Sequence, residues 1–151
     1  MSKYFGTDGF RGEANKVLKA DDAYKIGRYL GWYYSREHRG RIVIGKDTRR
    51  SSYMFEYALV AGITASGSDA FLLHVTTTPS VAYVVRTEEF DCGIMVSASH
   101  NPYYDNGIKI IDGNGHKIAS DIEEAMENYI DGIVEELPFA TGEAVGTRSE
   151  E

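Results

Sequence analysis

The chain has 151 residues, which is enough for one domain with a hydrophobic core and too few for two domains of ordinary size. Hydrophobic residues make up 42% of it and aromatic residues 12%, so a disordered or fibrous protein is excluded. The net charge of −7 argues against nucleic acid or an anionic membrane as a partner, and an anionic ligand would need a local basic cluster. With one cysteine, Cys92, and no apolar leader or spanning segment in the sequence, we expect a cytoplasmic protein.

Along the chain, short apolar runs alternate with amphipathic stretches of helical length. We predict helices over residues 21–38, 51–67, 79–89 and 120–130, and strands over residues 41–45, 70–74, 92–96, 107–111 and 116–118. Expected end signals are acidic residues at 21–22, capping serines at 51–52, Gly67 as a left-handed helix end, Thr78 before Pro79, a Ser120–Glu123 capping box, and a hairpin turn at 112–115.

These elements predict an α/β fold with three layers, α/β/α, around a mostly parallel mixed sheet that includes an antiparallel hairpin. Residues 1–137 form the domain. Residues 138–151 lack periodicity and are rich in Gly, Thr and Glu, so we expect a linker or disordered tail there. In such sheets, ligands bind outside the carboxyl ends of the strands.

Several familiar functional motifs match this sequence only in part. "GRIVIGK" at 40–46 resembles a phosphate-binding loop, but Asp47 stands where Ser or Thr is required and the residues between form a strand. "GNG" at 113–115 lacks the third glycine of a dinucleotide fingerprint, and neither Ser97 nor Ser99 lies in a Gly-x-Ser-x-Gly elbow. The four histidines are scattered, so a zinc site is not expected.

The segment "SASHNPYYDNGIK", residues 97–109, has the strongest chemical content. It follows a buried strand and offers hydroxyls, an imidazole, an amide, a proline, an Asx-Gly turn and a lysine. Together with "YFGTDGFRG", "IGKDTR" and "TPSVAY", it resembles the first domain of the α-D-phosphohexomutases over roughly residues 3–132. The residues of these motifs are most similar to those of the branch of that family that interconverts glucosamine 6-phosphate and glucosamine 1-phosphate.

The resemblance implies roles for individual residues. Ser99, directly before His-Asn-Pro, corresponds to the phosphorylated serine, and Ser97 is its structural neighbour. His100, Lys109 and Arg11 would act beside the transferring phosphoryl group. Thr7, Gly9, Asn101 and Arg49 would bind the substrate or its phosphate, and Ser99 would ligate a metal through its phosphate.

Simpler explanations exist for several of these side chains. The 6–12 segment is also compatible with an ordinary turn, Lys109 with a solvated strand residue, and His100 with a residue that only holds the loop. Arg49 and Asp47 could form a buried ion pair that fixes the loop. The sequence leaves these alternatives open.

The family resemblance also implies a reaction and its partners. Phosphoserine would give its phosphoryl group to a hexosamine phosphate, and a sugar bisphosphate would turn over before the second transfer. In the family, Mg²⁺ is held by an Asp-Gly-Asp-Gly-Asp-Arg loop in a second domain, and the third and fourth domains bind the substrate. None of these motifs occurs here, so we expect this chain alone not to interconvert sugar phosphates. A first domain of a mannose- or glucose-phosphate mutase, or a non-catalytic phosphosugar-binding module, remains an alternative.

Overall fold

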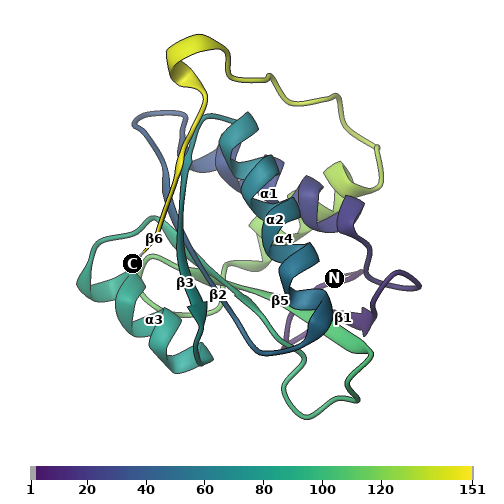
Figure 1. The fold of residues 1–151 in the computed structure, drawn as a ribbon. Helices are drawn as coiled ribbons and strands as arrows, with labels where there is room; N and C mark the ends of the chain where they lie inside the picture. The colour runs from purple at the N-terminus through teal and green to yellow at the C-terminus, as the bar shows by residue number, and fades with distance from the viewer. Residues whose placement is uncertain (1–2, 151) are drawn as a thin grey trace.

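A mixed six-stranded sheet organises residues 3–150, the part of the chain that the computed structural model describes (Figure 1). The strands are β1 (Phe10–Glu13), β2 (Arg41–Lys46), β3 (Asp69–Val75), β4 (Cys92–Val96), β5 (Asp105–Asp112) and β6 (Arg148–Glu150), in the order β1-β5-β4-β2-β3-β6. Strand β2 pairs in parallel with β3 and β4, and β3 with β6, whereas β5 pairs antiparallel with β1 and β4. The predicted mostly parallel mixed sheet is confirmed.

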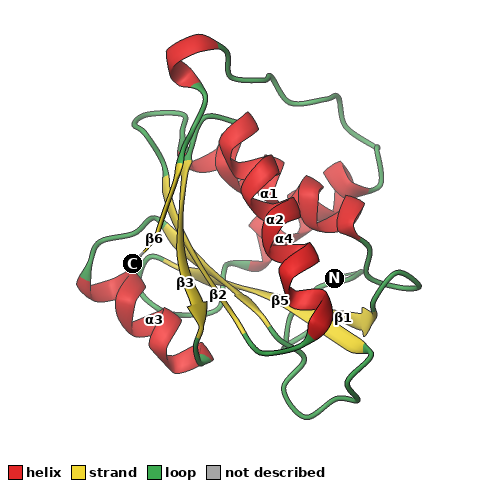
Figure 2. Cartoon of the chain, viewed as in Figure 1, coloured by secondary structure: helices red, strands yellow, loops and turns green. Residues whose placement is uncertain are grey.

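Helices cover both faces of this sheet, as Figure 2 shows. Helices α1 (Ala20–Tyr34), α2 (Arg50–Ala65) and α4 (Ser120–Ile130) lie on one face, and α3 (Thr78–Thr87) lies on the other. A short 3₁₀ helix, η1 (Gly142–Ala144), lies in the C-terminal segment. The three-layer prediction is therefore confirmed, and no described helix is long and apolar enough to cross a membrane.

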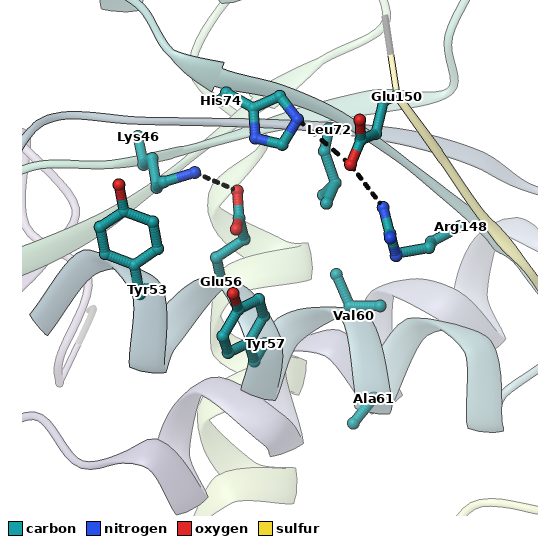
Figure 3. A pocket seen from close by; sticks show the side chains of 10 residues that line it. All are labelled: Lys46, Tyr53, Glu56, Tyr57, Val60, Ala61, Leu72, His74, Arg148 and Glu150. Atoms are coloured by element: carbon teal, nitrogen blue, oxygen red, sulfur yellow. Dashed lines mark hydrogen bonds and ion pairs between the residues drawn. The ribbon is translucent and has the colours of Figure 1, made fainter.

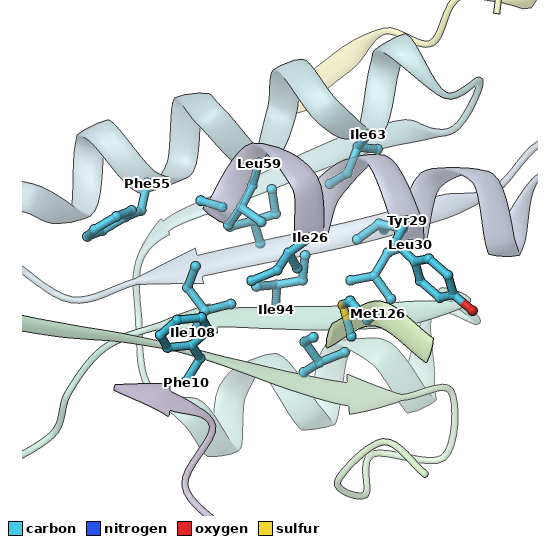
Figure 4. Packing of buried hydrophobic residues seen from close by; sticks show 14 of the residues in the cluster. Phe10, Ile26, Tyr29, Leu30, Phe55, Leu59, Ile63, Ile94, Ile108 and Met126 are labelled. Carbon is cyan, nitrogen blue, oxygen red and sulfur yellow. The ribbon is translucent and has the colours of Figure 1, made fainter. Parts of the chain in front are cut away.

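Alternation along the strands divides the core into two clusters. Ile42 and Ile44 of β2 belong to the large cluster under α1, α2 and α4, whereas Val43 belongs to the smaller one under α3. Figure 4 shows side chains of α1 and α2, such as Ile26 and Leu59, packed over the sheet in the large cluster. The sheet is thus buried on both faces, which explains the continuous apolar runs of its central strands.

Most helix ends differ from the expected ones by a residue or two, but α1 ends at Tyr34, four residues before the expected end at residue 38. Helix α2 has Arg49 at its N-cap and α4 has Ala119, and neither cap makes a side-chain hydrogen bond, so the capping roles predicted for the serines are wrong. The N-cap of α3 is Thr77, which accepts a hydrogen bond from the Ser80 amide, with Pro79 in the first turn as expected. Gly67 has the predicted left-handed conformation, with φ of 98°.

Two strands were not predicted. Strand β1 begins in the glycine-rich 6–12 segment, extends to Glu13 and forms by pairing with β5. The arm predicted at 116–118 is only an isolated bridge between Ile111 and Lys117, although the turn at 112–115 is present. The second unpredicted strand, β6, lies in the C-terminal segment.

The C-terminal segment, where we expected a linker or disordered tail, is held against the domain and contains η1 and β6. Buried Arg28 donates hydrogen bonds to the carbonyl oxygens of Leu137 and Pro138, at 2.6 and 3.2 Å. Arg39 donates to carbonyl oxygens in the 143–145 turn. In Figure 1 this segment crosses from α4 to the far edge of the sheet, where β6 pairs with β3. Whether it links to a further domain stays a prediction.

Candidate active site

The loop between β4 and β5, residues 97–104, lies at the carboxyl edge of the sheet, the edge where ligands are expected. Its start is fixed to β5, because the Ser97 amide donates to the Gly107 carbonyl at 2.9 Å. Two turns follow inside it, through hydrogen bonds from Asn101 to Ala98 and from Asp105 to Pro102, each 3.0 Å. The loop therefore has a defined backbone although it lacks helix and strand.

Ser99 lies at an exposed position of this loop in an uncommon conformation. Its φ is 54°, in the left-handed region that non-glycine residues rarely adopt. Its amide donates to Ser97 Oγ at 3.0 Å, so Ser97 supports Ser99 from within the loop. Such strained positions are concentrated at functional sites. The neighbouring His100 is also exposed, and among the described residues it makes no hydrogen bond or ion pair.

Arg11 reaches this loop from β1. The register pairs Arg11 with Gly107, and a Cβ atom at Gly107 would lie only 2.8 Å from Arg11 Cγ. Glycine at 107 therefore lets the Arg11 side chain cross the sheet toward the loop. Its Nη1 donates a long hydrogen bond of 3.4 Å to Asn101 Oδ1, and its buried Nε has no partner among the described residues. Arg11 thus retains donors for an anionic group.

Lys109 lies on β5 on the same face as Arg11. The pairing of Phe10 with Ile108 makes Lys109 and Arg11 diagonal neighbours across the two strands, about 7–8 Å apart at Cα. Lys109 is half-buried and makes no ion pair or hydrogen bond with the described side chains. Two unpaired cations on one face give the local positive charge that the acidic chain otherwise lacks.

The turn before β1 packs directly against this strand. Gly6 and Gly9 exchange backbone hydrogen bonds of 3.2 and 3.3 Å, which leaves Thr7 exposed at the tip. Gly9 has φ of 90°, and a Cβ atom there would lie 2.4 Å from the Ile108 carbonyl oxygen. The turn can approach β5 only because residue 9 is glycine.

Arg49 is engaged differently from Arg11. Its Nη1 donates to the carbonyl oxygens of Pro102 and Asp105, at 2.6 and 3.0 Å. Its Nη2 donates to those of Ser99 and Asn101, at 2.7 and 3.0 Å. Its Nε donates to Asp47 Oδ2 at 2.9 Å, so all five donors of the guanidinium are used. The geometry favours the alternative in which Arg49 fixes the loop over the one in which it binds a phosphate.

Asp47 holds Arg49 in place and is itself well hydrogen-bonded. Burial alone would raise its pKa, but hydrogen bonds from the Arg49 amide, Ser97, Ser52 and the Arg49 guanidinium lower the pKa below its ordinary value. The carboxylate is therefore the stable form. It fixes the Arg49 guanidinium next to the loop carbonyls.

Sequence reasoning missed two buried side chains that support the site. Asn106 donates to Ser51 Oγ and Ser52 Oγ, at 2.9 and 3.0 Å, and so ties the start of α2 to β5. Glu127 of α4 accepts hydrogen bonds from three successive amides at Lys3, Tyr4 and Phe5, which lead into the 6–12 segment. The Asx-Gly turn predicted from the sequence is wrong, because residues 105–107 belong to strand β5, where Asn106 pairs with Gly12. Nothing local marks Glu127, because its partners lie 122–124 residues away in the chain.

A separate pocket of about 420 Å³ lies between α2 and the β2–β3–β6 part of the sheet (Figure 3). Its charged groups pair with each other: Lys46 Nζ lies 2.9 Å from Glu56 Oε2, and Glu150 contacts both His74 and Arg148. None of the site residues predicted from the sequence lines it. This pocket is distinct from the Ser99 loop.

The described residues contain no group of three or more His, Cys, Asp or Glu side chains that could hold a metal ion. A metal at Ser99 would therefore need ligands from outside residues 3–150. The site as it stands combines an exposed hydroxyl on a fixed loop with two unpaired cations on the adjoining strands.

Comparison with known proteins gives a consistent result. The family described as phosphoglucomutase/phosphomannomutase, alpha/beta/alpha domain I, matches residues 2–136. A phosphoglucosamine mutase of Lachnoclostridium phytofermentans is 67% identical over 146 residues, covering 97% of this chain and 33% of that protein. Another, from Lachnospira eligens, is 66% identical over 149 residues, with the same two coverages.

Solved structures agree with the sequence relatives. A phosphoglucomutase/phosphomannomutase family protein from Burkholderia thailandensis superposes with a TM-score of 0.78 at 27% identity, over 99% of this chain and 33% of that one. The chain thus spans about a third of the length of the curated relatives that it matches.

Proposed function

Since the chain belongs to the phosphoglucomutase/phosphomannomutase family, as its α/β/α domain I, we propose that it supplies the phosphoserine domain of a phosphoglucosamine mutase. In this proposal Ser99 is the phosphoryl carrier, and glucosamine 6-phosphate and glucosamine 1-phosphate are the substrates. The product would feed reactions that consume amino-sugar phosphates, such as those that make cell-wall precursors.

The exposure of Ser99 and the position of the Arg11 side chain near its loop support the proposal most. Ser99 is exposed on a loop whose backbone is fixed, and the Arg11 side chain crosses Gly107 toward that loop with Nε unpaired. Phosphoryl transfer needs positioning and positive charge more than covalent chemistry from the protein. Arg11 and Lys109 would provide that charge, and His100 is exposed beside the phosphate position.

The reaction follows from these roles. The bond between Ser99 Oγ and phosphorus breaks and a bond from phosphorus to a sugar hydroxyl oxygen forms. The sugar hydroxyl loses its proton and Ser99 Oγ gains one, so the serine leaves as a free hydroxyl and the step is balanced. The resulting bisphosphate turns over and returns its other phosphoryl group to Ser99 Oγ, which restores the phosphoserine. Arg11 and Lys109 would face the equatorial oxygens, whose negative charge persists through both transfers.

In this proposal, this domain would contribute to a magnesium site only through the phosphate on Ser99. Phosphate oxygens suit this hard cation, but the described residues lack the carboxylate cluster that would complete a site. Its remaining ligands, and the groups that select the sugar, would come from further domains. Strand β6 runs parallel to β3, so both strands point toward the edge of the sheet that bears Ser99.

Two other functions remain distinguishable by experiment. A mannose- or glucose-phosphate mutase would use the same domain; the names of the two relatives above and the residues of the motifs favour glucosamine phosphate. A non-catalytic phosphosugar-binding module would leave Ser99 unmodified. We also propose a cytoplasmic location, which rests on the sequence and on the metabolic role.

A chimera provides the test. Residues 1–146 replace the matching domain of the Lachnoclostridium phytofermentans protein, and conversion of glucosamine 6-phosphate, mannose 6-phosphate and glucose 6-phosphate is measured with Mg²⁺ and a bisphosphate activator. We expect conversion of the glucosamine substrate, with phosphate mapped to Ser99. Ser99→Ala should lower turnover by about 10³-fold or more, and Ser97→Ala by much less.

Other outcomes would reject specific parts of the proposal. Phosphate on Ser97 with Ser99 bare would overturn the choice of nucleophile. The choice between the sugar branches is tested on a full-length protein that carries this domain with its own further domains, because in the chimera the host's domains select the sugar. Faster conversion of mannose or glucose phosphate there would favour the alternative branch. An inactive chimera that still folds cooperatively and binds a sugar phosphate would favour the non-catalytic module.

A further inference from the structure

Arg49 occupies the centre of the loop that presents Ser99. Four carbonyl oxygens from residues 99, 101, 102 and 105 point at its guanidinium, at distances of 2.6 to 3.0 Å. A loop with so many inward carbonyls needs donors at its centre, because unpaired carbonyl oxygens facing each other would repel and force the loop open. The side chain is only 11% exposed, so water has little access to replace it.

Contacts outside the loop fix the orientation of the Arg49 side chain. Asp47 follows β2 and accepts from both the Arg49 amide and Nε, at 3.0 and 2.9 Å. The Asp47 amide in turn donates to the Val96 carbonyl at 3.1 Å, at the end of β4. Asp47 thus holds the guanidinium at the edge of the sheet, in the position from which it donates to the loop carbonyl oxygens. A planar fork with five donors fits this arrangement, whereas a lysine ammonium, with three donors at one point, does not.

We infer that Arg49 is a positioning residue, which closes the 99–105 loop around its guanidinium and holds the Ser99 backbone in its left-handed conformation. It acts through Ser99 and does not touch the substrate phosphate. The catalytic consequence rests on the proposed function, whereas the closure of the loop does not.

Arg49 and Arg11 have different roles, although the sequence suggests phosphate contacts for both. Arg11 has a single long hydrogen bond and an unpaired Nε, as a ligand-binding arginine would have without its ligand. Arg49 has no donor left. Loss of Arg49 should therefore misplace the nucleophile and lower kcat, whereas loss of Arg11 should remove a direct contact with the phosphoryl group.

Loop closure is tested first on the 151-residue chain itself. Tyr103 and Tyr104 are 87% and 49% exposed within the loop, so chymotrypsin cleavage after them reports loop opening. We expect Arg49→Lys to increase the cleavage rate about tenfold or more without loss of the cooperative thermal transition. Arg50→Lys, the same change at the next, exposed residue, is the matched control and should cleave like the wild type.

The effect on catalysis is then measured in the chimera. We expect Arg49→Lys to lower kcat by about 10²-fold with KM within about twofold of the wild type, as for a misplaced reacting group. In Arg49→Ala, millimolar ethylguanidinium should restore part of both the protease resistance and kcat.

The remaining outcomes overturn the inference. A raised KM with an intact, protease-resistant loop would mean that Arg49 binds the substrate. Wild-type cleavage and wild-type kcat in Arg49→Lys would mean that the loop closes without the guanidinium. If the chimera is inactive but Arg49→Lys still opens the loop, the proposed function fails while the closure of the loop by Arg49 stands.

Discussion

Glu127→Gln tests how the segment that leads into the Arg11 strand is held. Glu127 is 4% exposed and accepts hydrogen bonds from the amides of Lys3, Tyr4 and Phe5, at 3.0, 2.7 and 2.9 Å. Hydrogen bonds to a charged group contribute about 1.5–3 kcal/mol each, and neutral ones about 0.5–1.5 kcal/mol. Glutamine thus loses roughly 1 kcal/mol per amide, and part of this is offset because a neutral amide is easier to bury, so we expect a net loss of about 2 kcal/mol.

The pH dependence of this loss follows from the pKa of Glu127. Burial alone would raise the pKa, but the three backbone donors lower it below its ordinary value of 4.5. A carboxyl group with a lowered folded-state pKa stabilises the fold above its unfolded-state pKa, and this contribution disappears as the pH falls through the folded-state pKa. The free-energy difference between wild type and Glu127→Gln should therefore be constant near neutral pH and narrow below 4.5.

Urea unfolding at several pH values measures this difference, and a thermal melt should show a midpoint lowered by about 4–8 °C at neutral pH. Glu135→Gln makes the same chemical change at an exposed position and serves as the control. A difference below about 0.5 kcal/mol at neutral pH, or one that persists unchanged to about pH 3, would refute the reasoning.

Two further substitutions test the local arguments. Gly9→Ala places a Cβ 2.4 Å from the Ile108 carbonyl oxygen at a positive φ, so urea unfolding should show a free energy of unfolding lowered by about 2–4 kcal/mol. Gly6→Ala in the same turn meets no atom, so its free energy of unfolding should stay within about 0.5 kcal/mol of the wild type. Equal losses in the two variants would contradict the close approach of the turn to β5. Arg28→Ala removes donors to the C-terminal segment and should speed amide exchange at Ala140 about tenfold or more, and unchanged exchange would show that the segment is held without Arg28.

The central elements and the 97–104 loop were predictable because their signals are local. A β-branched run marks β2, an apolar run marks β4, periodic apolar positions mark the helices, and the polar residues after Val96 mark the loop. Strand β1 was not predictable, because its four residues lie in a glycine-rich segment and become a strand only by pairing with β5, about a hundred positions later. Strand β6 contains Arg148 and Glu150, charged residues with little strand preference, and depends on contacts made by the segment before it.

The role of Arg49 shows why the supporting side chains of the site could not be read from the sequence. A motif identifies Arg49 as part of the site, yet its spacing says nothing about where five donors point. Four of the five acceptors lie 50 to 56 residues later in the chain and are backbone carbonyl oxygens, which every residue type provides; the fifth is the Asp47 carboxylate. Only the folded geometry separates the ion pair that fixes the loop from a phosphate contact.

The use of donors also distinguishes the arginines across the whole domain. Arg28, Arg39 and Arg49 each donate to several acceptors in segments with little regular secondary structure, and so supplement the sparse backbone pairing of those segments. Arg28 Nε has no partner either, but its two terminal nitrogens make four hydrogen bonds. Arg11 makes one, at 3.4 Å. A buried arginine nitrogen without a partner is costly unless a ligand completes it, and Arg11 Nε is such a nitrogen, which supports our proposal that the transferring phosphoryl group lies at Arg11.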